Sequence, residues 1–223
     1  MPRVARNQNS TRISTRHRLL EAAGDIFAQK GYHNATVRDI CRRARSNVAA
    51  VNYYFGNKRR LYAAVLQYAH RCALQKHPPD QGLPAGAPPQ DRLKAFVRSL
   101  LQRLFDKGKP AWHHKLMARE IIEPTGALES LVRHSIKPQY EALSRIIEEL
   151  LGNHAPPEEV RACTNSVVGQ CMHLYHSGPV LTRLVPDMSY EPADIEWWAN
   201  HIARFSLAAI QRLRDMDGDG SAA

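Results

Sequence analysis

Eleven histidines and four cysteines are the side chains of this 223-residue chain that could hold a metal ion. His113 adjoins a second histidine, and His173 is followed by another three residues on, so either pair could supply imidazole ligands. Cys163 or Cys171 could add a thiolate. The sequence contains no HExxH and no paired CxxC, so these histidines are interpreted as pocket or surface residues and no metal site is expected. A metal-responsive regulator that uses these C-terminal histidines and cysteines remains an alternative.

Acid–base chemistry is the second possibility, because Glu120 and Glu123 lie within ten residues of His113. No nucleophile motif accompanies them, and the sequence lacks a P-loop, a GxGxxG motif and a nucleophile elbow. A helical hydrolase is therefore only a distant alternative. We expect no catalytic residue and no cofactor, and a buried polar network around Arg119 and Glu120 is the preferred interpretation.

The basic residues gather at the N-terminal end of the chain. Residues 1–71 hold 14 basic and 3 acidic side chains, a net charge of +11, whereas residues 72–223 hold 17 and 18. Charge that served only solubility would be spread over the whole chain. A basic head on a neutral body therefore predicts a polyanionic partner for the head.

Composition and cysteine usage indicate a globular protein of the cytoplasm. The hydrophobic fraction is 43% and the charged fraction 23%, which is ordinary globular usage. No apolar run approaches the roughly 18 residues of a membrane span, and the first fifteen residues lack the apolar core of a signal peptide. The four cysteines are widely spaced, so reduced thiols are expected.

Apolar residues recur at three- and four-residue spacings, and no stretch alternates with period two, so the predicted fold class is all-α. Gly31 is the expected stop of the first helix. Thr36 and Asn47 are candidate N-caps of two short helices separated by a tight turn. The expected helices of this first part are 14–30, 36–44, 48–54 and 58–76.

Residues 77–90 contain five prolines and two glycines, which predicts a loop between the head and the rest of the chain. Beyond it, further helices are separated by proline and glycine residues, and Pro138 should kink or divide one of them. These helices are expected at 91–107, 110–122, 127–151, 157–178 and 191–214.

Two short helices joined by a tight turn, within a segment of high positive charge, are the elements of a helix-turn-helix. The second short helix carries Val48, Ala49, Ala50 and Val51, and such small side chains allow a close approach to base edges in the major groove. Lys58 places an ammonium group at the start of the next helix, where a phosphate could lie.

This head resembles the DNA-binding domain of the TetR family of transcriptional regulators. The family pattern is close to AGVSxGxLYxHFxSKxxL, and residues 44–61 read ARSNVAAVNYYFGNKRRL. Further matches upstream are Ile26-Phe27, Lys30-Gly31-Tyr32 and the run 36–40. The resemblance covers about Arg16 to Val65 and implies a three-helix DNA-binding head.

The resemblance implies a role for each matching residue. The second helix would touch phosphates, the third would face base edges, and the residues after it would hold phosphates. Arg45 stands in place of the usual turn glycine and adds a charge near the backbone, and Arg60 replaces an acidic residue. The predicted DNA-binding residues are Thr36, Arg38, Arg45, Asn47, Ala50, Asn52, Tyr53, Tyr54 and Lys58.

The C-terminal part is similar to the TetR subgroup with a CecR-like C-terminal domain. The similar residues include Arg119-Glu120, Pro124-Thr125, Pro138 and Gly169-Gln170. The resemblance implies a helical ligand sensor whose last two helices form the interface of a homodimer. That would place 157–178 and 191–210 at the two-fold axis.

Aromatic, soft or polar residues on apolar helix faces would suit an amphipathic small molecule, although at helical spacing such residues are more often part of a core. Uncharged polar residues such as Asn165 and Gln170 would need partners if buried, and a dimer contact or a ligand would supply them. The predicted ligand-binding residues are Trp112, His113, Met117, Tyr140, Gln170 and His173.

The sequence thus predicts an all-α regulator of four parts: a flexible basic arm (1–12), a three-helix helix-turn-helix domain (13–60), a helical ligand-binding and dimerisation domain (61–214) and a frayed tail (215–223). It would bind double-stranded DNA as a homodimer at a palindromic operator, most simply as a repressor, and leave it when a small-molecule effector binds. No membrane partner is expected.

Overall fold

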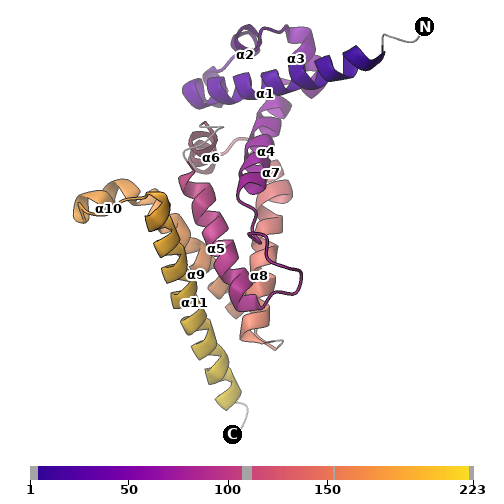
Figure 1. Ribbon diagram of the computed structural model, residues 1–223. Coiled ribbons are helices and arrows are strands. Elements are labelled where there is room, and N and C mark those ends of the chain that lie inside the picture. Colours follow the sequence, from indigo (N-terminus) through magenta and orange to yellow (C-terminus); the bar gives the residue numbers. More distant parts are fainter. Residues whose placement is uncertain (1–4, 107–111, 153, 221–223) are drawn as a thin grey trace. The chain divides into compact units, whose positions relative to one another are not determined.

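The computed structural model describes residues 5–106, 112–152 and 154–220 (Figure 1). Over these residues the regular secondary structure is entirely helical, which confirms the predicted fold class. The elements are α1 (Ala5–Asn34), α2 (Val37–Arg43), α3 (Val48–Phe55), α4 (Lys58–Lys76), α5 (Pro89–Phe105), α6 (His113–Ile122), α7 (Leu128–Leu131), η1 (Val132–Ile136), α8 (Lys137–Leu151), α9 (Pro157–His176), α10 (Gly178–Leu184) and α11 (Pro192–Gly220).

The chain folds as two compact units. The N-terminal unit comprises residues 1–72 and 107–137, and the C-terminal unit comprises 73–106 and 138–223. The segment 107–137 is thus part of the unit that holds the helix-turn-helix, whereas the predicted domain division assigned it to the sensor. Apolar residues of α6 and α7, including Leu116 and Leu131, pack into the core of the N-terminal unit.

Most element boundaries agree with the predicted ones, and three differ. α1 begins at Ala5, so residues 5–12 of the predicted basic arm are helical, while residues 1–4 lie outside the described part. α10 was not predicted, because its seven residues follow Gly178-Pro179, which was interpreted as a break. α11 continues to Gly220, so residues 215–220 of the predicted frayed tail are helical, and 221–223 are outside the described residues.

Pro138 divides the predicted helix 127–151, as expected. A proline cannot donate to the carbonyl four residues before it, and its ring crowds that carbonyl. The backbone accommodates this with a π-helical turn at Val132–Ile136, and a regular helix resumes at Lys137. The long helix therefore becomes α7, η1 and α8.

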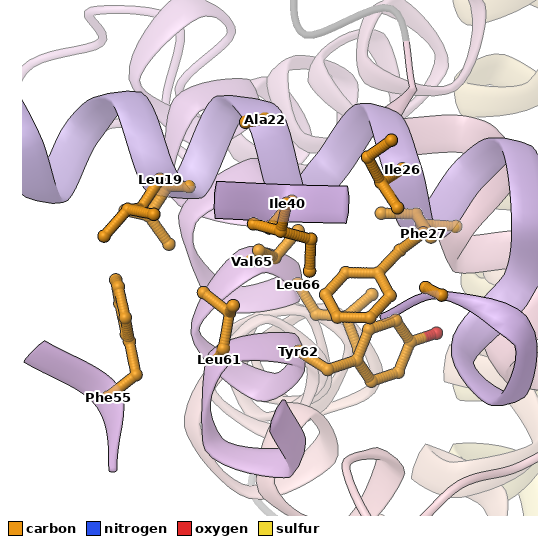
Figure 2. Close-up of a cluster of buried hydrophobic side chains, with 14 of the residues drawn as sticks. Leu19, Ala22, Ile26, Phe27, Ile40, Phe55, Leu61, Tyr62, Val65 and Leu66 are labelled. Carbon is orange, nitrogen blue, oxygen red and sulfur yellow. The ribbon is translucent and has the colours of Figure 1, made fainter. Parts of the chain in front are cut away.

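The core of the N-terminal unit is built from aromatic and aliphatic side chains of α1, α2 and α4 (Figure 2). Phe27 and Tyr62 are fully buried and meet edge to face, with ring centroids 4.8 Å apart. Ile40 of α2 and Phe55 of α3 join the same cluster. These contacts hold the two short helices on α1 and α4, because helices of seven and eight residues are not stable alone.

The C-terminal unit has a separate core in which α5 and α9 pack against α11. Leu93, Leu101 and Cys171 are among its fully buried side chains. Arg103 is also buried, and desolvation lowers the pKa of its guanidinium to about 10. Its Nε donates to the carbonyl oxygen of Ser99 at 3.2 Å.

No helix in the described part of the chain is long and apolar enough to cross a membrane.

Candidate nucleic-acid interface

The first short helix of the helix-turn-helix is capped as the sequence predicts. The Thr36 hydroxyl accepts a hydrogen bond from the backbone N–H of Asp39 at 3.1 Å, which satisfies one of the exposed donors of the first turn. Asp39 in turn accepts from Lys30 Nζ at 2.7 Å. The hydrogen bonds from Lys30 and Thr36 lower the pKa of the Asp39 carboxyl. α2 is therefore anchored at its N-terminus to the end of α1.

The second short helix, α3, is capped by Asn47, whose Oδ1 accepts from the backbone N–H of Ala50 at 2.8 Å. Val51 and Phe55 point into the core, four residues apart on one face. Asn52 and Tyr53 lie on the opposite, exposed face, and 64% of the Tyr53 surface is accessible. The helix thus buries a narrow apolar edge and presents a polar face outward.

The turn between α2 and α3 contains Arg45 in the left-handed region, with φ of 50°. A glycine would take this conformation without strain, and a residue with a Cβ does so at some cost. The turn is therefore strained at the position where the family pattern has a glycine. The result is an exposed guanidinium two residues before the N-cap Asn47.

Lys58 makes contacts that the sequence did not predict. Its Nζ donates to the carbonyl oxygen of His33 at 3.1 Å and lies 4.7 Å from the ring centre of Tyr32. Partial burial lowers the pKa of this ammonium group. Lys58 therefore ties the start of α4 to the end of α1, and any phosphate contact would come in addition to this structural role.

The other predicted DNA-binding residues all belong to the same helix-turn-helix. Thr36, Arg38, Arg45, Asn47 and Asn52 are exposed, whereas Ala50 and Tyr54 are half-buried. Their roles toward DNA stay predictions, because the structure contains the protein alone.

Two arginines near the start of the described side chains of α1 were missed by sequence reasoning. Arg16 lies with its Cζ 5.5 Å from the ring centre of Phe55. Arg18 Nε donates to the carbonyl oxygen of Ala44, the residue before Arg45, at 3.4 Å. The sequence did contain a clue to both arginines. They stand directly before the apolar pair Leu19 and Leu20, and residues next to a buried pair lie at the edge of the core.

The six predicted ligand-binding residues are divided between the two units. Trp112, His113 and Met117 belong to the N-terminal unit, and Trp112 is a core residue there: its ring lies so close to Gly24 that a Cβ on Gly24 would come within 2.1 Å. Tyr140, Gln170 and His173 belong to the C-terminal unit. No single unit holds all six.

Within the C-terminal unit these polar groups have partners in the chain itself. Gln170 Nε2 donates to Ser206 Oγ at 3.1 Å, and Tyr140 donates to Asn165 Oδ1 at 3.3 Å. His173 is exposed, with its Nδ1 3.1 Å from Ser177 Oγ. The half-buried amide nitrogen of Gln170 therefore has acceptors within the chain itself.

A groove that the sequence did not reveal lies between α5 and α11 of the C-terminal unit, with a volume of about 570 Å³. Trp197 and Leu207 supply apolar surface. Lys94, Arg204 and Asp91 are the charged side chains in its lining. The volume is within the range of small-molecule sites.

The cysteines are free thiols. Burial raises the pKa of the Cys171 thiol to about 12 and also raises the pKa values of Cys41 and Cys163, so these three are weak nucleophiles. Among the side chains that the structure describes, no group of three histidine, cysteine or acidic residues is arranged to hold a metal ion.

Two capped short helices on a common core, with exposed polar and basic residues on the second helix and its turn, define a helix-turn-helix DNA-binding protein. Residues 19–65 match the family described as bacterial regulatory proteins, tetR family. Residues 89–210 match the C-terminal domain of the HTH-type transcriptional dual regulator CecR. The chain therefore belongs to the TetR family of transcriptional regulators, with a CecR-type C-terminal domain, as the sequence resemblance predicts. Its relatives are regulators and not enzymes.

Curated relatives agree with this assignment. The chain is 29% identical over 163 residues to CecR of Shigella flexneri, an alignment that covers 69% of this chain and 72% of CecR. It is 23% identical over 214 residues to the HTH-type transcriptional regulator UidR of Escherichia coli strain K12, covering 95% of both.

Solved structures show the same fold. A TetR-like transcriptional regulator from Rhodococcus sp. RHA1 has a TM-score of 0.61 at 17% identity, covering 94% of this chain and 98% of the other. AibR, solved in complex with isovaleryl coenzyme A and operator DNA, has a TM-score of 0.58 at 18% identity, covering 85% and 96%.

Proposed function

We propose that this regulator is a repressor that binds a palindromic operator as a homodimer and is released by a small-molecule effector. The observation that carries the proposal is the exposed polar face of α3, which follows the exposed Arg45 in a head of net charge +11. A two-fold symmetric protein requires two-fold symmetry in its DNA site, with half-sites about one helical turn apart.

An aromatic face on α11 supports the dimer. Trp197 and Phe205 are 59% and 60% exposed, which is unusual for side chains of this size. His201 stacks on Trp197 with 2° between the ring planes and lies 6.3 Å from Phe205. The spacing of four residues aligns the three rings on one side of the helix. A second copy of α11 would remove this surface from water.

An organic effector is favoured over a metal ion. AibR was solved with both isovaleryl coenzyme A and operator DNA, so a protein of this fold binds a small molecule and DNA together. The α5–α11 groove, with the cations Lys94 and Arg204 in its lining, suits an amphipathic anion. Because Trp197 lies both in this groove and on the aromatic face of α11, a second copy of α11 would form part of the same site. An effector that prefers the DNA-free state weakens operator binding by about 1–3 kcal/mol in typical cases.

Selection of bound duplexes from a random DNA pool tests the DNA-binding role. We expect a palindromic consensus that the protein binds at least about 10³-fold more tightly than scrambled DNA at the same salt concentration. Weak binding that ignores sequence and disappears with salt would refute the proposal, since the head would then be only an electrostatic surface.

Paired variants then test the roles of individual residues on the selected operator. Asn52→Ala should change the base preference, whereas Arg38→Ala should weaken binding to all sequences and reduce the salt slope by about one. Lys58→Ala is a poorer probe of phosphate contact, because the loss of its bond to His33 would also loosen α4. Arg145→Ala, an exposed arginine of α8, is the matched control and should bind normally.

The dimer has its own test. Phe205→Glu should convert a dimer into a monomer in light scattering, because it would bury charge in the proposed interface. Met216→Glu, an exposed position further along the same helix, is the control and should remain dimeric. A Phe205→Glu dimer would mean that the copies associate through another surface.

A further inference from the structure

A small, partly open pocket lies on the N-terminal unit beside the end of α1. It is lined by residues 30–34 at the end of α1, by Tyr62 of α4, and by Arg119, Glu123 and Thr125 of α6 and the residues that follow it. Its volume is about 80 Å³. That is room for a phosphate or carboxylate group, or for two or three water molecules at about 30 Å³ each.

Arg119 supplies an unsatisfied donor to this cavity. Its Nη1 is buried and has no hydrogen-bond acceptor among the described residues. A buried guanidinium N–H without an acceptor is costly, because the group has lost its water and gained nothing in return. Such a donor in a cavity indicates an acceptor that the protein itself does not provide.

The backbone at Gly31 is shaped around this guanidinium. Gly31 has φ of 78°, a conformation that favours glycine. A Cβ at Gly31 would lie 3.0 Å from Arg119 Nη1 and 3.3 Å from Cζ. Because Gly31 has no side chain, the Arg119 guanidinium can occupy this space at the cavity wall.

The carboxylate of Glu120, which bonds to two residues of the lining, is already engaged with other donors. Glu120 is fully buried and accepts from the Tyr62 hydroxyl at 3.0 Å and from the backbone N–H and hydroxyl of Thr125 at 2.9 and 3.0 Å. Burial, and then the charge and hydrogen bond of Glu120, raise the pKa of Tyr62, so its hydroxyl keeps its proton. Glu120 thus neutralises part of the local charge without accepting from Arg119 Nη1 in the structure.

The guanidinium of Arg119 favours an anion over water in this pocket. The lining holds two permanent cations, Lys30 and Arg119, and one carboxylate, that of the exposed Glu123. Because Lys30 Nζ already donates to Asp39 at 2.7 Å, Arg119 is the principal cation for an anion. Charge-assisted hydrogen bonds from a guanidinium to an oxyanion are about twice as strong as neutral ones. A bound oxyanion would join the loop 31–34 to α6 inside the unit.

We propose that this cavity is a binding site for a small oxyanion, a phosphate group or a carboxylate, with Arg119 Nη1 as its principal donor. Its lining contains none of the nine predicted DNA-binding residues, but the His33 carbonyl and the Tyr32 ring in the lining contact Lys58, which is one of those nine. The site requires neither DNA nor an organic effector to be present.

Calorimetric titration of the full-length protein tests the proposal, with inorganic phosphate and acetate as two separate probes at constant ionic strength. We expect saturable binding of one probe per chain; phosphate alone would identify a phosphate site, and acetate alone a carboxylate site. Arg119→Gln should weaken the binding at least about tenfold, whereas Glu123→Gln should strengthen it because it removes the negative charge from the lining.

Two controls keep the result decisive. Arg45→Gln removes an exposed cation from the DNA-facing turn and should leave the affinity unchanged; if it abolishes binding instead, the anion occupies the DNA-contact surface and the proposal is wrong. If Arg119→Gln fails to fold by circular dichroism, Lys30→Gln, at an exposed side chain of the same lining, takes its place and should weaken binding.

No saturable binding of either probe to the wild-type protein would mean that water fills the cavity, and would overturn the proposal. None of these measurements involves DNA, so their outcome is independent of the repressor test.

Discussion

In α2 and α3 of the N-terminal unit, polar side chains cap the helices or face solvent, whereas in α9 and α11 of the C-terminal unit they pair with one another below the surface. Thr36 and Asn47 each bond to a backbone N–H three residues on. Gln170 instead donates a hydrogen bond to Ser206, thirty-six residues away. The hydroxyl oxygens of Thr164 and of Ser144 on α8 lie 3.3 Å apart.

The two regions differ in whether a polar contact joins residues close in sequence or residues far apart. A cap is a contact between residues close in sequence, so its residue types and spacing reveal it directly. A pair such as Gln170 and Ser206 exists only after two helices have packed, and no spacing in the sequence predicts it. The head can therefore present unpaired polar groups such as Asn52 to a partner, while the body uses its polar groups internally.

The largest expected effect is in the core that supports the caps. Phe27→Ala should lower the free energy of unfolding by about 3–5 kcal/mol, because it removes a fully buried ring that touches Tyr62. Urea unfolding followed by Trp112 fluorescence, with Trp197 and Trp198 replaced by Phe, reports on this unit. A loss below about 1 kcal/mol would show that the head does not depend on this core.

The long-range pair should matter next. Gln170→Ala leaves the buried Ser206 hydroxyl without its donor and should cost about 1–3 kcal/mol. The double variant Gln170→Ala/Ser206→Ala removes both partners and should recover part of that loss. Urea midpoints at one fixed protein concentration measure this. If the losses of the two single variants simply add in the double variant, the Gln170–Ser206 hydrogen bond contributes no stability beyond what each side chain contributes separately.

The local cap should have a smaller effect. Asn47→Ala should destabilise the head by about 1 kcal/mol, because the Ala50 N–H loses its side-chain acceptor and keeps only the longer bond to the Asn47 carbonyl oxygen, and Asn47→Asp should restore most of the loss. Thermal unfolding of the three proteins in parallel measures the difference. If Asp and Ala behaved alike, the cap hydrogen bond would contribute little.

These contrasts explain what the sequence could and could not predict. The boundaries of α2 and α3 were predicted closely because the caps Thr36 and Asn47 act within a few residues of their own positions. Gly31, with its positive φ, interrupts α1 where the sequence predicts the end of the first helix. The sequence could not predict the left-handed conformation of Arg45, because that depends on how much strain the surrounding core tolerates. Nor could it predict the hydrogen bond from Lys58 to His33, because that depends on how α4 packs against α1.

The ligand-binding residues were the least predictable part. A tryptophan at this spacing could equally line a pocket or fill a core, so the sequence does not decide between the two. The structure decides it, because the Trp112 ring packs against Gly24 of α1, eighty-eight positions earlier in the chain. The segment that contains Trp112 folds with the N-terminal unit, which no composition shift in the sequence indicates. The α5–α11 groove likewise exists only once the two helices have packed.

The smallest effect is a pH dependence at the start of α2. Hydrogen bonds from Lys30 and then Thr36 hold the pKa of Asp39 below its usual value of 3.8 in the folded protein. Because the folded pKa is the lower one, the charged carboxylate stabilises the fold at any pH above the unfolded value, and this contribution is lost as the pH falls through the folded value. Asp39→Asn removes the charge at every pH. The difference in urea midpoint between wild type and Asp39→Asn should therefore be constant from about pH 7 to about pH 5 and should shrink below about pH 4. A difference that grows on acidification would show that another carboxylate, and not this anchor of the helix-turn-helix, dominates the acid response of the head.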